Sequence, residues 1–172
     1  MTAVNQKVAV ITGASQGIGA ALVQAYRKHS CAVVANSRSI RASDDAGVVT
    51  VTGDIADPAI ARIVIDAAVR DFGRVDTLVN NAGIFIAKPF TDYTAEDYQA
   101  LIGVNLTGFV TTTQLAIAQM LRQGEGAGLH PMGRMGTISD IVDGVLYLEN
   151  ARSSPARSCT STAAAKAPVT DR

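Results

Sequence analysis

Three glycines lie close together near the start of the chain, at Gly13, Gly17 and Gly19. The apolar run 7–12 before them predicts a buried strand, and apolar side chains at helical spacing over 17–29 predict a helix directly after them. Glycines at such a junction allow a tight turn and let the backbone approach a phosphate, whose charge the free amide groups of the helix N-terminus can meet. A glycine loop alone also fits an ordinary turn, but its place between strand and helix favours binding of a pyrophosphate.

Further polar residues stand where a ligand site could use them. The pair Asp54-Ile55 follows a third apolar run, Asn80-Asn81-Ala82-Gly83 ends a fourth, and Asn105 lies in a long apolar segment. Taken singly, Asp54 fits a loop carboxylate or a cap, the two asparagines fit a turn, and Asn105 fits a side chain that bonds nearby backbone. On the residues alone, these interpretations stay open.

Such a site requires a scaffold of alternating strands and helices. Strands are predicted over 7–12, 31–35, 48–51 and 75–80, and helices over 17–29, 58–72 and 94–123, the last of them bent near Gly108. Asp57 is the expected cap of the second helix, and Gly73 is its expected stop. This alternation predicts an α/β fold with a doubly wound parallel sheet, whose ligand lies at the carboxyl ends of the strands.

The glycine spacing Gly-x-x-x-Gly-x-Gly and the ordered matches after it resemble the short-chain dehydrogenase/reductase family over residues 4–123. The resemblance implies a Rossmann-like three-layer domain with strand order 3-2-1-4, incomplete because later strands are missing. It implies carbonyl reduction or alcohol oxidation by hydride transfer with NAD(P), on a small carbonyl or alcohol substrate. The residues expected to contact the cofactor are Gly13, Ser15, Gln16, Gly17, Ile18, Gly19, Ser37, Arg38, Asp54, Ile55, Asn81, Ala82 and Gly83.

The choice between NADP and NAD depends on the end of the second predicted strand. An acidic residue there would bond the ribose 2′-hydroxyl and repel a 2′-phosphate, whereas Ser37 and Arg38 can donate to that phosphate. The pattern predicts NADP, with NAD as the alternative if Arg38 is a solvated surface cation. Gln16 stands where many NADP-preferring relatives carry a basic residue.

The family's proton-transfer residues have no counterpart in these 172 residues. The family uses a Ser and a Tyr-x-x-x-Lys pair, but none of the tyrosines, Tyr26, Tyr93, Tyr98 and Tyr147, has a lysine four residues later. Tyr93 and Tyr98 are expected to pack at a helix entry. Asn105 is the one remaining family catalytic position, and it orients rather than transfers protons. We therefore expect little or no activity; the alternative is a non-catalytic nucleotide-binding or interaction protein that pairs with an intact relative.

The C-terminal third departs from the family's order. A dinucleotide-binding domain is predicted over 1–150, with an internal deletion near 124–130 and a late helix over 138–148. The segment 151–172 contains no Leu, Ile or Phe. When residues 152–164 are back-translated with GC-rich codons, the neighbouring reading frame can encode a sequence that resembles the family's last strand and its ending. It is predicted to be a disordered, frameshifted tail; the alternative is an ordinary flexible extension.

Composition limits the partners. Fifteen basic and fifteen acidic side chains give zero net charge, which predicts no nucleic-acid partner. No apolar run approaches the roughly 18 residues of a membrane span and no secretory leader is visible, so no membrane association and a cytoplasmic location are expected. Cys31 and Cys159 have no clustered His or Cys beside them, which predicts no metal site. The missing strands predict an exposed strand edge, and with it a homo- or hetero-oligomer.

Overall fold

The computed structural model describes residues 6–124. All the described residues belong to one compact unit. The predicted deletion near 124–130, the predicted helix over 138–148 and the predicted tail over 151–172 lie outside the described residues, apart from Gly124.

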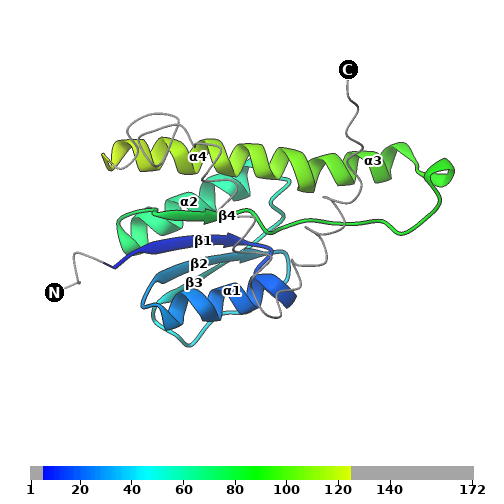
Figure 1. Cartoon of the computed structure of the whole chain (residues 1–172). Coiled ribbons are helices and arrows are strands. Elements are labelled where there is room, and N and C mark those ends of the chain that lie inside the picture. Colours follow the sequence, from blue (N-terminus) through cyan, green and yellow to red (C-terminus); the bar gives the residue numbers. More distant parts are fainter. Residues whose placement is uncertain (1–5, 125–172) are drawn as a thin grey trace, which may run out of the picture. The chain divides into compact units, whose positions relative to one another are not determined.

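Four parallel strands form one sheet: β1 (Val8–Thr12), β2 (Ala32–Ser37), β3 (Val48–Thr52) and β4 (Thr77–Val79). Their order in the sheet is β3-β2-β1-β4, with β1 paired on both sides (Figure 1). This α/β fold with strand order 3-2-1-4 confirms the prediction. β2 runs two residues beyond the predicted 31–35 because Asn36 and Ser37 pair with Val51 and Thr52 of β3.

Helices cover both faces of the sheet (Figure 1). On one face, α1 (Gly17–Lys28) packs Leu22 and Val23 against Ile11 and Val33 of the strands. On the other face, α2 (Pro58–Phe72) and α4 (Phe109–Arg122) share a second core with the alternate strand residues, among them Val8, Val10 and Val34. Burial on both faces explains why β1 is an unbroken apolar run.

The ends of α2 lie where the sequence predicts them. Asp57 accepts a hydrogen bond from the backbone N–H of Ala59 at 2.8 Å, and Pro58 opens the helix. Gly73 ends it in the left-handed conformation, with φ of +83°, which a glycine adopts without strain.

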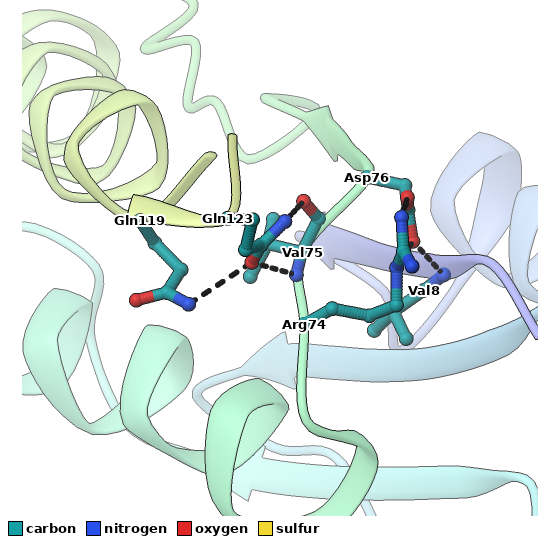
Figure 2. A network of polar contacts seen from close by, with 6 residues as sticks. All are labelled: Val8, Arg74, Val75, Asp76, Gln119 and Gln123. Atoms are coloured by element: carbon teal, nitrogen blue, oxygen red, sulfur yellow. Dashed lines mark hydrogen bonds and ion pairs between the residues drawn. The ribbon is translucent and has the colours of Figure 1, made fainter. Parts of the chain in front are cut away.

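β4 is shorter than the predicted strand 75–80, because side chains and a turn satisfy the backbone at both of its ends. The N–H of Val75 donates to Oε1 of Gln123 and its carbonyl accepts from Nε2, both at 2.8 Å (Figure 2). The side chain of Gln123, the C-cap residue of α4, therefore satisfies both backbone groups of Val75. At the other end, the N–H of Asn81 donates to the carbonyl of Val79 at 3.0 Å.

A long helical segment follows a single 3-10 turn, η1 (Phe90–Asp92), and comprises α3 (Ala95–Ile102), the π-helical η2 (Gly103–Gly108) and α4. Thr94 and Asp97 cap its start reciprocally. The π-helical turns stand where the sequence predicts a bend. By length and composition alone the described segment 95–122 could cross a membrane, contrary to the sequence expectation, although core helices of soluble proteins pass the same test.

Candidate dinucleotide-binding site

A cavity of about 360 Å³ opens at the carboxyl ends of the strands. Every cofactor residue expected from the sequence lines it: the glycine loop after β1, Ser37 and Arg38 after β2, Asp54 and Ile55 after β3, and the 81–83 segment after β4. The structure adds five lining residues that sequence reasoning missed: Asn36, Ser39, Gly53, Ile84 and Val104. Asn36, Ser39, Gly53 and Ile84 adjoin predicted site residues, so their nearness in sequence was the available signal.

The glycine loop has two distinct reasons for its glycines. A Cβ at Gly19 would lie 2.2 Å from the carbonyl oxygen of Gly13, so this glycine lets the helix approach the loop. Gly17, in contrast, has φ of +55°, and a Cβ there would meet no protein atom within 4 Å. Gly17 is therefore needed for its backbone conformation, and the space in front of it is open.

The start of α1 is available to an anion. Its N-cap residue, Gln16, makes no side-chain capping hydrogen bond, and no acidic residue stands in its first turn. By comparison, Asp57 caps α2 and the Thr94–Asp97 pair caps α3. The uncapped amide groups of α1 border the cavity, where a negatively charged group would satisfy them.

Thr12, a residue that sequence reasoning did not assign to the site, fastens the β4 end to the glycine loop. Its hydroxyl oxygen accepts from the N–H groups of Asn81 and Ala82, at 3.1 and 3.0 Å. In return, Nδ2 of Asn81 donates to the carbonyls of Thr12 and Gly13, at 3.0 and 3.1 Å. These four hydrogen bonds therefore fix the glycine loop and the segment after β4, which form two walls of the cavity, relative to each other.

The β2 end of the cavity carries hydroxyls and one cation. The Ser37 hydroxyl donates to Oγ of Ser15 at 2.9 Å, which joins the glycine loop to β2. Nη1 of Arg38 lies 3.9 Å from Oδ2 of Asp54. Asn36, buried beneath them, donates from Nδ2 to the carbonyls of Val51 and Gly53.

Asn105, the predicted catalytic residue, contacts backbone rather than the main cavity. Its Oδ1 accepts from the N–H of Ile84 at 2.8 Å, and its Nδ2 donates to the carbonyl of Ile84 at 2.9 Å. Ile84 lines the main cavity, whereas Asn105 lines a neighbouring cavity of about 60 Å³ with Thr12 and Asn80. The Asn105 carboxamide thus holds the two peptide groups on either side of the Ile84 Cα, and Ile84 lines the main cavity.

The tyrosines of the described region take different places. Tyr93 donates its hydroxyl to the carbonyl of Ile86 at 2.5 Å, under the cation of Lys88. Tyr98 is 63% exposed, so the prediction that it packs at a helix entry is wrong: its helix face points to solvent. Tyr26, a residue of α1, packs against the core cluster of Ile11 and Val33 in the sheet. Among residues 6–124, no three His, Cys, Asp or Glu side chains gather as metal ligands.

A parallel sheet of this order, with a glycine loop at its carboxyl edge, defines a Rossmann-like domain. Residues 7–128 match the family model of short chain dehydrogenases, and the chain belongs to this family of oxidoreductases, which bind NAD(P). It is 38% identical over 156 residues to an uncharacterised oxidoreductase of Methylorubrum extorquens, covering 85% of this chain and 59% of that protein. It is also 38% identical to 3beta-hydroxysteroid dehydrogenase 1 of Eggerthella lenta, covering 67% of this chain and 48% of that enzyme.

The chain is also similar to solved structures of this family. A short-chain dehydrogenase/reductase from Serratia marcescens matches with a TM-score of 0.61 and 32% identity, over 66% of this chain and 52% of that one. A blue fluorescent protein from a metagenomic library, solved in complex with NADPH, matches with a TM-score of 0.59 and 34% identity, over 66% and 51%. The chain thus spans about half the length of the relatives that it matches.

Proposed function

We propose that the cavity at the carboxyl ends of the strands binds a nicotinamide dinucleotide, NADP in preference to NAD. The observation that carries the proposal is that every cofactor residue expected from the sequence lines this one cavity. Membership of the family supports it, as does the NADPH bound by one solved relative.

The residues present fit the pyrophosphate of such a cofactor. The open space in front of Gly17 and the uncapped amide groups of α1 would receive the two phosphates. Asp54 and Ile55, on the β3 side of the cavity, would border the adenine.

The preference for NADP rests on the donors after β2. Ser37, Arg38 and Ser15 offer two hydroxyls and a guanidinium to a 2′-phosphate, and no acidic residue ends β2. NAD, which carries a hydroxyl in place of that phosphate, would gain less from Arg38.

Catalysis by this chain is proposed to be weak or absent. The bound nicotinamide would give or take a hydride at a carbonyl or alcohol carbon, and that carbon's oxygen then needs a proton donor or acceptor. The 172 residues hold no Tyr-x-x-x-Lys pair, and Asn105 has both polar atoms on the backbone of Ile84, which makes it a positioning residue. A cytoplasmic location is proposed with this role.

A titration of the full chain with NADPH and with NADH, followed by nicotinamide fluorescence, tests the binding proposal. Arg38→Ala should weaken NADPH binding about tenfold more than NADH binding, because hydrogen bonds to charged groups contribute about 1.5–3 kcal/mol. Arg41→Ala, which removes an exposed cation outside the cavity, is the matched control and should leave the ratio unchanged. Failure of both cofactors to bind would contradict the proposal.

Turnover is tested separately by adding a panel of ketones to the NADPH complex. We expect binding without oxidation of the nicotinamide. Sustained oxidation that depends on a ketone would show that the chain performs the chemistry without the family's Tyr and Lys.

A second candidate function is interaction with an intact relative. Residues 98–121 contain no Asp, Glu, Lys or Arg, and this helix exposes Leu106, Phe109, Val110, Ile117 and Leu121. An uncharged apolar face of this kind is typical of an interface. Size-exclusion chromatography with light scattering, on the chain alone and mixed with the full-length Methylorubrum extorquens relative, tests this candidate: separate elution at micromolar concentration would contradict it.

A further inference from the structure

The cation that would recognise a 2′-phosphate already has an anionic neighbour. Nη1 of Arg38 lies 3.9 Å from Oδ2 of Asp54, and both residues line the cavity proposed for the cofactor. We infer that Asp54 is a specificity-determining residue: it competes with the 2′-phosphate of NADP for Arg38 and so reduces the preference for NADP over NAD. This inference rests on the proposed function.

The carboxylate is the fixed member of the pair. Oδ1 of Asp54 accepts a hydrogen bond from the backbone N–H of Ala56 at 3.0 Å, which holds the side chain against its own turn. Among the described residues, Arg38 has this one ion pair and no hydrogen bond, and its side chain is 67% exposed. A 2′-phosphate must therefore draw the guanidinium away from a stationary carboxylate, or share it.

Competition of this kind acts on one cofactor only. The two dinucleotides share the adenine, the pyrophosphate and the nicotinamide, so any contact of Asp54 with those groups affects both equally. Only NADP brings a phosphate to the β2 end, where Ser37, Ser15 and Arg38 stand. The ratio of the two dissociation constants thus isolates the effect of Asp54 on the 2′-phosphate.

The expected effect is modest because the pair is exposed. The Asp54 side chain is 43% exposed, and ion pairs in such surroundings change an equilibrium by about two- to fivefold. Asp54→Asn should therefore raise the NADPH-over-NADH affinity ratio about two- to fivefold. Asparagine keeps the oxygen that accepts from Ala56, so the turn survives the substitution.

The matched control is Asp57→Asn. Asp57 lies three residues after Asp54, caps α2 and does not line the cavity. Its replacement by Asn removes the same charge as Asp54→Asn. Asparagine caps a helix as well as aspartate does, so this variant reports the change in net charge alone. Both variants are titrated with NADPH and NADH as the full chain, and again in the Arg38→Ala background.

We expect the ratio to rise in Asp54→Asn but not in Asp57→Asn, and the rise to shrink when Arg38 is replaced. A ratio that rises no more than in the control, or that rises by the full amount without Arg38, would overturn the competition. If the unmodified chain binds neither cofactor, the proposed function itself fails, which separates the two results. Adenosine 2′,5′-bisphosphate and 5′-AMP, which lack the nicotinamide and differ only in the 2′-phosphate, should give the same change of ratio.

Discussion

The carboxamide of Gln123 holds the backbone of Val75, which precedes β4, and its removal should destabilise the domain. Val75 is fully buried, and Gln123 satisfies both its N–H and its carbonyl at 2.8 Å. Gln119 donates to Oε1 of Gln123 at 3.0 Å and so orients the carboxamide (Figure 2). The perturbation is Gln123→Ala, which leaves the backbone of the helix end unchanged and removes both bonds.

The magnitude follows from the two orphaned groups. Each buried polar group left without a partner costs about 1–3 kcal/mol, and a water entering beside the partly exposed helix end would recover part of this. We expect the free energy of unfolding to fall by about 2–4 kcal/mol, a large share of the roughly 5–15 kcal/mol typical of a domain.

Urea denaturation, followed by far-ultraviolet circular dichroism, measures this loss. Gln114→Ala is the matched control, because Gln114 lies on the exposed face of the same helix, and it should change the free energy by less than about 0.5 kcal/mol. A loss in Gln123→Ala no larger than in this control would refute the view that the carboxamide stabilises the domain through the backbone of Val75.

Three further predictions concern charge, packing and the cavity wall. Hydrogen bonding from Lys88 lowers the pKa of Asp97 to about 2 from 3.8, so the stability from this pair is present above 3.8 and is lost as the pH falls toward 2. Urea unfolding at a series of pH values should show a shallower fall in Lys88→Met, and equal slopes would contradict this. Gly108→Ala would place a Cβ 2.9 Å from the backbone oxygen and Cγ2 of Ile55, and should lower the melting temperature through a loss of about 1–3 kcal/mol; an unchanged melting temperature would show that the contact relaxes. Asn105→Ala frees the N–H and the carbonyl of Ile84, and should weaken NADPH binding severalfold; equal affinity would contradict the positioning role of Asn105.

Much of the fold could be predicted from local pattern. Unbroken apolar runs of strand length between helical repeats indicate a parallel sheet, because such strands are buried on both faces. Asp57, Pro58 and Gly73 marked both ends of α2 because capping depends on neighbouring residues only. The strand order came from the family resemblance, not from these local signals.

The candidate site was predictable in its members but not in its connections. Gly13, Asp54 and Asn81 each follow a strand, and parallel strands bring their carboxyl ends to one edge. That Thr12 bonds Asn81 and Ala82 depends on how closely β1 and β4 approach, which no spacing in the sequence encodes.

The sequence by itself determined the α/β class and the glycine loop, because these follow from periodicity and from position after a strand. The family resemblance indicated most of the residues around the cavity, and the structure added five more. Only the tertiary structure decided that β4 is shorter than the predicted strand, that Asn105 hydrogen-bonds the backbone of Ile84 and that Arg38 lies beside Asp54. Each of these depends on contacts between residues far apart in the chain, whose side-chain geometry is set by packing rather than by local propensity.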